Sequence, residues 1–340
     1  MKMNLIIIAL SFVLNFIFFK YSDVVAKKIN LYDIPDNKRK LHKKPIPING
    51  GIFYFFNLML IFIFDVFFND FKILSEFGFI NEVDAILTLL IIFLLLLLGI
   101  IDDKISIKPL SKSVLSIIIF YAFLSIRTDY QIISLRFDTF NFGLDLFNLS
   151  LIFTVLCFMI FQILLNMYDG INLQSASYYS IILIYLAIVN YNLNFSMLCI
   201  LSLIYLAFFA IYNYQQKIFL GDNGIYIFSF ILALLIIQTY DNRSNNFTVE
   251  EIFIILFVPT IDMVRLFFRR VLRNKNPLKA DRKHLHHILL ARHGLIKTNF
   301  LLIAPLILSI LLINLANLNL LIIINLNFII YVSLIKFKKR

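Results

Sequence analysis

The 340-residue chain has no tryptophan, two cysteines and few charged side chains. Charged residues make up 15% of the sequence, whereas about 25% is usual in soluble domains. Apolar residues make up 61%, more than a water-soluble fold could bury, so the composition excludes a soluble globular protein. Cys157 and Cys199 both fall within apolar segments, which argues against a disulfide framework.

Apolar runs of about 20 residues recur along the chain and predict transmembrane helices. The first run, Met3 to Phe19, is followed directly by Lys20 and lacks a small-residue cleavage site, so it is interpreted as a retained helix. We expect an all-α polytopic membrane protein with about ten or eleven transmembrane helices. Because tryptophan is absent, tyrosine and phenylalanine must form any aromatic belt. The predicted spans are roughly 3–20, 51–68, 84–101, 113–127, 150–165, 175–190, 195–213, 224–240, 251–268, 299–315 and 318–335.

Lysine and arginine are distributed very unevenly between the loops. One side of the predicted membrane carries most of them, whereas the other side carries Lys2, Lys72, Arg127, Arg136 and Arg243. The positive-inside rule makes the rich side cytoplasmic, with the N-terminus outside and the C-terminus inside. The net charge of +11 would also attract anionic head groups and phosphates. We expect one transmembrane domain over 1–340, with cytoplasmic catalytic loops at about 21–50, 102–112, 166–174, 214–223 and 269–298. No nucleic-acid partner is expected, because the chain lacks a soluble domain to bind one.

Five unusual polar stretches fall on the predicted cytoplasmic side. Each has a plain structural interpretation, such as a positive-inside loop, an interfacial helix end, an Asp-Gly turn, a helix cap or a solvated basic loop. The adjacent carboxylates Asp102 and Asp103 instead call for a cation, since they lie at a helix C-terminus. Asp262 lies in an apolar helix, where an acid is functional by default. The stretches are "DNKRKLHKKPIPINGG" (36–51), "GIIDDKISIKPLSK" (99–112), "NMYDGIN" (166–172), "GDNG" (221–224) and "VPTIDMVRLFFRRVLRNKNPLKADRKHLHH" (258–287).

Taken together, the five stretches predict a site for phosphate chemistry. Aspartate and asparagine oxygens suit a hard cation such as Mg²⁺, and arginine, lysine and protonated histidine suit phosphate. The sequence has no HExxH, Walker A or GxGxxG pattern. We therefore expect phosphoryl transfer to or from a lipid. A transporter built around Asp262 is an alternative that predicts internal repeats and polar residues near mid-span. A non-catalytic scaffold is a third.

The same stretches resemble the polyprenyl-phosphate N-acetylhexosamine-1-phosphate transferases, the glycosyltransferase-4 family. "PDNKRKLHKKPIPINGG", "DDK", "NMYDGIN", "GDNG" and "NPLKADRKHLHHILL" look like the motifs of that family and occur in the same order. The His-x-His-His form of the last is similar to the branch that uses UDP-N-acetylglucosamine. Three residues depart from the family pattern: Asn172 stands where Asp is usual, Leu173 where Gly is usual and Ile225 where Ser is usual.

The resemblance implies transfer of a HexNAc-1-phosphate from a UDP-sugar to undecaprenyl phosphate, with release of UMP. It also implies a Mg²⁺ cofactor, with Mn²⁺ as an alternative, and a site on the cytoplasmic face of the bacterial plasma membrane. A homodimer is compatible with it. The resemblance implies Asp222 as the main metal ligand, with Asn166 beside it, and Asp169 near the metal or nucleotide. The pyrophosphate would contact Arg282, His284, His286 and His287, the lipid phosphate would contact Arg39, Lys104 and Lys112, and His42 and Asp262 would also bind substrate.

The role of Asp102 and Asp103 stays open between three alternatives. A general base gains little, because a phosphate monoester has a second pKa of about 6 and is mostly a dianion at pH 7. We favour a role in positioning Lys104, the lipid phosphate or the metal. An aspartyl-phosphate intermediate is the remaining alternative.

Overall fold

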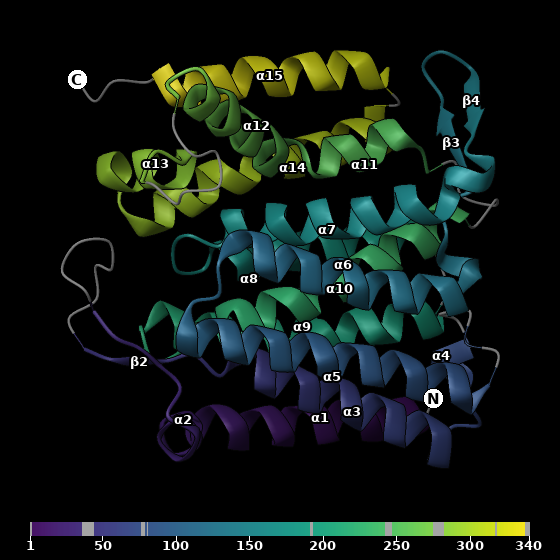
Figure 1. Ribbon diagram of the computed structural model, residues 1–340, viewed down its shortest axis with the longest axis vertical. Helices are drawn as coiled ribbons and strands as arrows, with labels where there is room; N and C mark the ends of the chain where they lie inside the picture. Colours follow the sequence, from purple (N-terminus) through teal and green to yellow (C-terminus); the bar gives the residue numbers. More distant parts are fainter. Residues whose placement is uncertain are drawn as a thin grey trace.

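The computed structural model describes residues 2–35, 44–75, 79, 81–190, 193–241, 247–274, 282–316 and 318–336 (Figure 1). Most of these residues lie in helices, and the long helices of the bundle run side by side along one direction (Figure 1). The helices are α1 (Lys2–Lys20), α2 (Ser22–Ile29), α3 (Gly50–Phe68), α4 (Lys72–Ser75), α5 (Glu82–Ile105), α6 (Pro109–Ile126), α7 (Ser150–Tyr168), α8 (Gln174–Asn190), α9 (Leu193–Tyr214), α10 (Gly221–Asp241), α11 (Val249–Ile255), α12 (Phe257–Val271), α13 (Leu285–His293), α14 (Leu295–Ala316) and α15 (Leu320–Lys336).

Two short antiparallel strand pairs accompany the helices. Strand β1 (Tyr32–Asp33) pairs with β2 (Ile46–Pro47), and β3 (Ser134–Phe137) pairs with β4 (Phe142–Asp145). The two pairs lie at opposite ends of the helix bundle (Figure 1). Two 3₁₀ turns, η1 (Thr128–Tyr130) and η2 (Phe147–Leu149), flank the second pair. The strands therefore belong to the ends of the bundle, where the backbone leaves the predicted hydrocarbon region.

The prediction of an all-α polytopic membrane protein is confirmed. Within the described residues, seven helices are long and apolar enough to cross a membrane, and the pair α1–α2, bent by 62°, makes an eighth if it counts as one span. All eleven predicted spans are helical, but α8 and α15 each have 17 residues. The predicted span 251–268 is divided at Leu256 into α11 and α12, so that segment is not a single span.

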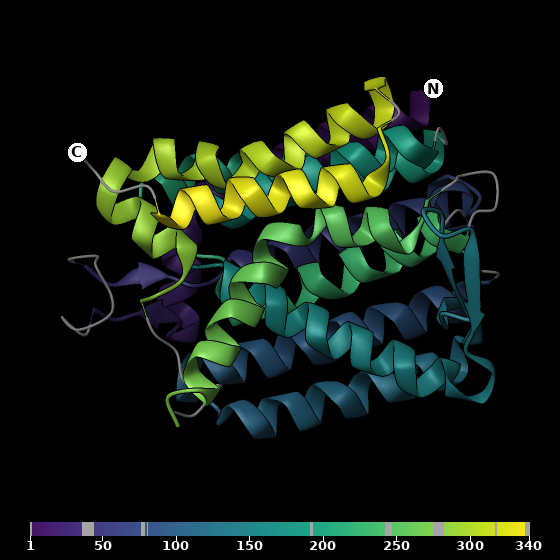
Figure 2. The same ribbon diagram turned by 90° about the horizontal axis from the view of Figure 1, so that it is seen from above.

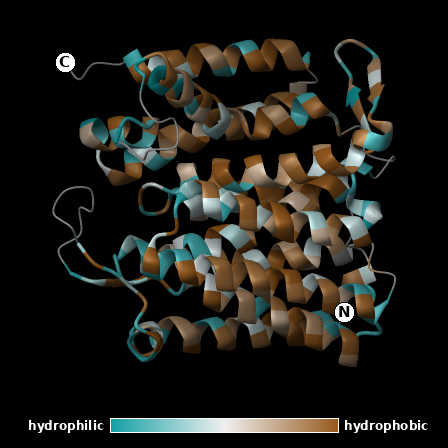
Figure 3. Ribbon diagram, in the orientation of Figure 1, coloured by the Kyte–Doolittle hydropathy of each residue, from teal (hydrophilic) through white to brown (hydrophobic). Residues whose placement is uncertain are grey.

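The bundle is apolar along its middle and polar at its ends (Figure 3). Helix α1 begins at one end of the bundle and α15 ends at the other (Figures 1 and 2). This arrangement agrees with termini on opposite sides of a membrane. The cytoplasmic assignment of the basic side stays a prediction.

Helix α10 forms the centre of the bundle. It is apolar around its whole circumference, and such a helix is expected to be buried. The most apolar 18-residue stretch of α10 is 94% buried, and its neighbours include α3, α5, α7 and α8. Helix α5 comes especially close at Gly99, where an added Cβ would lie 2.2 Å from the Cα of Asn223. The missing side chain lets the last turns of α5 lie directly against the first turn of α10.

The polar motifs lie on helix ends more than on loops, which corrects the predicted loop boundaries. Helix α5 continues through Asp102 and Asp103 and ends in a left-handed cap at Ser106. Helix α6 then begins at Pro109, whose fixed φ suits the first turn, so Lys112 is helical. Asp222 lies in the first turn of α10 and Asn166 in the last turn of α7. Helix ends hold these side chains more rigidly than loops would.

Candidate active site

Asp103 caps the start of α10 from a different helix. The first backbone N–H groups of an α-helix have no partner within the helix. Asp103 supplies one for two of them, since its Oδ1 accepts from the N–H of Asp222 at 2.9 Å and its Oδ2 from that of Asn223 at 3.1 Å. The side-chain amide of Asn223 also donates to Oδ2. Asp103 thereby fixes the position of Asp222.

Asp102 is also fully engaged by protein groups. Its Oδ1 accepts from the N–H of Ile107 at 2.8 Å, which closes the turn between α5 and α6. Its Oδ2 accepts from Lys112 Nζ and from the hydroxyl of Tyr226, each at 2.8 Å. The Lys112 amine also lies 3.7 Å from Asp222 Oδ2. One lysine thus lies between two acids that arrive from different helices.

The Asp222 carboxylate is more accessible than that of Asp102. About a quarter of its side chain is exposed, at 24%, whereas the side chain of Asp102 is 3% exposed. The side-chain amide of Asn166, from the last turn of α7, donates to Asp222 Oδ1. Asp222 and Asn166 are therefore in contact, and their role as metal ligands stays a prediction.

This pair can be compared with the requirements of Mg²⁺. Within the described part of the chain, no three His, Cys, Asp or Glu side chains group as a metal site. Mg²⁺ binds through one or two carboxylates and keeps its remaining positions for waters and substrate phosphates. One accessible carboxylate fits that requirement, and Asn166 faces it with its amide nitrogen, so the amide would have to turn to bring its oxygen to a metal. Asp222 Oδ1 accepts a hydrogen bond, as the oxygens of Asp102 and Asp103 do, so its greater exposure than Asp102 is what favours it.

Asp169 follows α7 directly and turns toward α8. Its Oδ1 accepts a hydrogen bond from the hydroxyl of Ser175. Burial raises the pKa of the Asp169 carboxyl to about 6, although the Ser175 hydrogen bond acts against that shift. The chain then passes through Leu173, whose φ of 68° lies in the left-handed region where the family pattern has glycine. A hydrogen bond from the Leu173 N–H to Asn213 Oδ1, at 2.7 Å, holds that conformation.

His286 packs directly on the turn that follows α7. A Cβ added to Gly170 would lie 1.9 Å from the Nε2 of His286, so only glycine leaves room for the ring. The Nδ1 of His286 lies 3.4 Å from the side-chain nitrogen of Gln174. Burial holds the pKa of His286 well below its ordinary value, and the neighbouring His287 and His284 add to the effect. His286 is therefore neutral at pH 7 in the unliganded protein.

The three histidines form one ring cluster. The rings of His284 and His286 are nearly parallel, with centroids 5.2 Å apart, and those of His286 and His287 are 4.3 Å apart. Asp262 contacts this cluster through a 2.8 Å hydrogen bond between its Oδ2 and His284 Nδ1. Burial by itself would raise the pKa of Asp262, but the His284 hydrogen bond and the charge of Arg265 lower it to about 2. Asp262 thus supports a histidine, which differs from the predicted direct contact with substrate.

The remaining predicted residues fall in three places. Arg39 and His42 lie outside the described residues. Lys104 is exposed to solvent, and the lysine that pairs with the acids is Lys112. Arg282 is exposed, shortly before α13.

Sequence reasoning missed several residues of the cluster. Tyr226 lies four residues after Asp222 and so on the same face of α10, a spacing that could have indicated it. Ser175 follows the "NMYDGIN" motif closely. Tyr331, which contacts Asp262, lies 69 residues away and gives no sequence signal.

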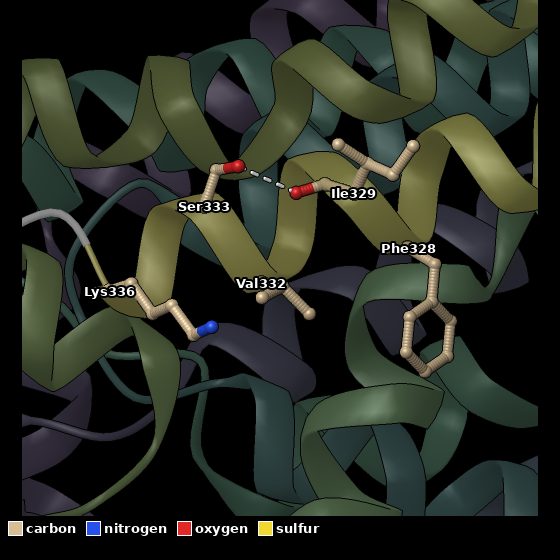
Figure 4. Close-up of a pocket in the computed structure, with 5 residues that line it drawn as sticks. All are labelled: Phe328, Ile329, Val332, Ser333 and Lys336. Carbon is tan, nitrogen blue, oxygen red and sulfur yellow. Dashed lines mark hydrogen bonds between the residues drawn. The ribbon is translucent and has the colours of Figure 1, made fainter.

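A pocket of the structure lies elsewhere, on the outer face of α15 (Figure 4). One stripe of that helix lines it: Phe328, Ile329, Val332, Ser333 and Lys336. The Ser333 hydroxyl donates to the backbone oxygen of Ile329 at 2.8 Å, as is common for serine within a helix. The acids and histidines of the candidate site do not line this pocket.

The fold and site define a class of protein: a polytopic helical membrane protein with a compact cluster of acids, a lysine and histidines at one end of its bundle. The sequence model of glycosyl transferase family 4 matches residues 85–240 of the chain. The matched segment contains the ends of α5, α7 and α10 that build the acid cluster.

Similar bacterial proteins match most of the chain. It is 28% identical over 272 residues to a probable undecaprenyl-phosphate N-acetylglucosaminyl 1-phosphate transferase of Bacillus subtilis, covering 78% of this chain and 72% of the relative. It is 26% identical over 318 residues to an undecaprenyl-phosphate alpha-N-acetylglucosaminyl 1-phosphate transferase of Pasteurella multocida, covering 89% and 82%. A protein of the same description from Escherichia coli K12 is 23% identical over 289 residues, covering 82% and 74%.

Proposed function

We propose that this protein transfers N-acetylglucosamine-1-phosphate, or a related HexNAc-1-phosphate, from a UDP-sugar to undecaprenyl phosphate and releases UMP. The observation that carries the proposal is the position of Asp222, accessible between Lys112 and Asn166 at a helix start that Asp103 caps. The match to the family model and the names of the relatives support the same reaction. It would be the first membrane step in the synthesis of a cell-envelope polysaccharide.

In this reaction an oxygen of the lipid phosphate attacks the β-phosphorus of the UDP-sugar. The new phosphorus–oxygen bond forms as the bond to UMP breaks, and UMP leaves with the electron pair. The attacking phosphate is mostly a dianion at pH 7, because its second pKa is about 6. It needs no base to remove a proton. Catalysis then depends on positioning and on neutralising the negative charges that meet.

The two adjacent acids act as positioning groups in this proposal. Both oxygens of Asp103 accept backbone N–H groups of α10, and both oxygens of Asp102 accept protein donors. These hydrogen bonds hold each acid against protein donors and support a positioning role. Asp102 directs Lys112 toward Asp222, and Lys112 supplies positive charge where phosphates would gather. This favours the positioning alternative, with Lys112 in the place that we expected for Lys104.

Asp222 and Asn166 would hold Mg²⁺, which neutralises the pyrophosphate and the departing UMP when bound. The histidine cluster would contact the pyrophosphate. Its His286 packs on Gly170, the residue that follows Asp169. Because His286 is neutral, it would contact phosphate oxygens as a hydrogen-bond donor and not as a cation. Positive charge would come from Lys112 and Arg282.

We place the site on the cytoplasmic face of the plasma membrane, because the basic loops lie on that side. The transporter alternative lacks a specific observation in its favour among the described residues. That alternative predicts polar residues near mid-span. The buried side-chain amides of Asn15 in α1 and Asn57 in α3 donate to each other's oxygens at 2.8 and 3.0 Å, so they connect the two helices.

The test is a transfer assay with purified protein, undecaprenyl phosphate, Mg²⁺ and a panel of radiolabelled UDP-HexNAc donors. The proposal expects a lipid-linked product and one equivalent of UMP, with N-acetylglucosamine as the preferred sugar. The variant Asp222→Asn should abolish both. Absence of product with every donor, from protein that is folded and monodisperse, would refute the proposed reaction.

A further inference from the structure

The last helix of the chain reaches the candidate site through one tyrosine. Tyr331 lies in α15 and is 3% exposed. Its hydroxyl donates to Asp262 Oδ1 at 2.9 Å and accepts from Arg265 Nε at 2.8 Å. One hydroxyl can make both bonds, since it has one proton to give and lone pairs to accept with. Helix α15 is therefore connected to the acid that supports His284.

Arg265 completes this connection from α12. Its Nη2 donates to Asp262 Oδ1 and to the backbone oxygen of Lys283, each at 2.7 Å. The N–H of Leu285 donates to both oxygens of Asp262 at 3.2 Å. The backbone on each side of His284 is thus tied to the same carboxylate and arginine.

These bonds fix both the orientation and the tautomer of His284. An ionised carboxylate only accepts hydrogen bonds, so the His284 Nδ1 that contacts Asp262 Oδ2 carries a proton. The other ring nitrogen, Nε2, is then the one that remains to contact a substrate. The ring lies nearly parallel to that of His286, with an interplanar angle of 6°. A small rotation of Asp262 would turn the His284 ring away from this arrangement.

We propose that Tyr331 is a positioning residue for the transfer reaction, acting through Asp262 on His284. The inference rests on the proposed function and adds a role for α15, a helix that carries none of the five sequence motifs. Tyr331 holds Asp262 in one orientation, and Arg265 holds Tyr331. The hydroxyl matters here and not only the ring, because its removal leaves the Nε of the partly buried Arg265 without that acceptor and takes one donor from Asp262.

The experiment is a double-mutant cycle with Tyr331→Phe and His284→Ala. Tyr331→Phe keeps the ring and its packing and should lower kcat about three- to tenfold, which corresponds to the loss of one buried hydrogen bond. The KM for undecaprenyl phosphate should not change. In the His284→Ala background the same substitution should cost less than about twofold, since its effect passes through His284. A radiolabelled donor keeps the residual rate measurable.

Tyr54→Phe is the matched control. Tyr54 is also a buried tyrosine with a hydrogen-bonded hydroxyl, 3.0 Å from Ser202, but it connects α3 to α9 and does not contact Asp262. It should leave kcat unchanged while lowering the melting temperature by a similar amount. If Tyr331→Phe does not fold, Arg265→Lys removes the Nε donor to Tyr331 together with the Nη2 bonds to Asp262 and Lys283, and its loss of kcat should also largely disappear in the His284→Ala background.

Two results would overturn the inference. One is a Tyr331→Phe variant with wild-type kcat. The other is a loss of the same size with and without His284, which would mean that the tyrosine only stabilises the fold. A wild-type protein without transfer activity would instead refute the proposed function, so the two failures are distinguishable.

Discussion

The carboxylate of Asp103, at the end of α5, accepts the backbone N–H of Asp222, in the first turn of α10, at 2.9 Å. This contact makes one acid the cap of the helix that presents another. The second oxygen of Asp103 accepts the N–H of Asn223, so a substitution at Asp103 changes where Asp222 lies. A catalytic defect in an Asp103 variant is therefore expected to be structural in origin.

Asp103→Asn should lower both stability and activity. Asparagine has one acceptor oxygen and one NH2 group, and the NH2 group would face a backbone N–H that needs an acceptor. The expected loss is about 1–2 kcal/mol of unfolding free energy. Thermal unfolding in detergent would measure it. If Asp103 acts by positioning, as proposed, the loss of rate should stay constant as the pH is raised from 6 to 9; a defect that shrinks with pH would restore the general-base alternative.

Asp65 offers a matched control for this variant. It is buried in α3 and caps α4, where its Oδ2 accepts from the N–H groups of Ile73 and Leu74 at 2.9 and 2.7 Å. Asp65→Asn removes the same kind of cap away from the acid cluster. It should lower stability by a similar amount and leave the specific activity of the folded protein near the wild-type value.

Lys112 and Lys104 should differ sharply in their effects. Lys112→Gln removes the cation that pairs with Asp102 at 2.8 Å and lies near Asp222, and a partly buried charge pair should cost at least tenfold in kcat/KM. Lys104→Gln changes an exposed side chain at the end of α5, beside Asp103, and should lower kcat/KM less than about twofold. Steady-state kinetics with both substrates would measure the two. Equal effects would contradict the assignment of Lys112 as the lysine of the site.

Gly170→Ala should impair activity with little effect on stability. The added Cβ would lie 1.9 Å from His286 Nε2, so the ring must move. Gly170 does not have a positive φ, so alanine fits its backbone and the unfolded chain loses entropy. We expect an activity loss of about tenfold or more with a melting temperature within a few degrees of wild type. The double variant Gly170→Ala/His286→Ala should be no worse than His286→Ala; an additive loss would show that Gly170 acts by another route.

Asp169→Asn should change stability in a way that depends on pH. Burial raises the pKa of Asp169 to about 6 in the folded protein, above the ordinary value of about 3.9. The folded state thus prefers the protonated acid, and its stability falls as the pH rises from about 4 to about 6 and stays lower above that. Asparagine still accepts the Ser175 hydrogen bond but carries no charge.

The Asp169→Asn variant should therefore melt at the wild-type temperature near pH 4.5 and at a higher temperature at pH 7.5. Unfolding would be followed with EDTA present and without substrate, so that no ligand contributes. A variant less stable than wild type at pH 7.5 would contradict the expected sign. Its activity should nevertheless be lower at pH 7.5 if the ionised acid contacts the metal or nucleotide.

How well the sequence predicted the site differs from one residue to the next. The pairing of Asp222 with Asn166 could be predicted from the resemblance of their motifs to those of the family, and the structure brings them into contact. The choice of Lys112 over Lys104 could not, because both follow the Asp-Asp pair closely. Only the left-handed cap at Ser106 and the start of α6 at Pro109 turn Lys112 back toward the acids.

The position of Asp262 shows the same limit of prediction from the sequence. Its place in an apolar segment indicated a functional acid, but the segment is divided into α11 and α12 and the acid supports His284. No local pattern could have predicted Tyr331, because its partner lies 69 residues earlier in the chain.

The sequence by itself determined that this protein lies in a lipid bilayer, and it predicted the kind of chemistry that its polar residues carry out. Apolar length fixes membrane helices, since the bilayer leaves no other way to satisfy the backbone, and the grouping of acids, amides and histidines predicts phosphate and hard cations as the ligands. The tertiary structure decided which of these groups are free to act. Burial and hydrogen bonding occupy Asp102 and Asp103, leave Asp222 accessible and hold His286 neutral, because these properties depend on neighbours that only the packed bundle brings together.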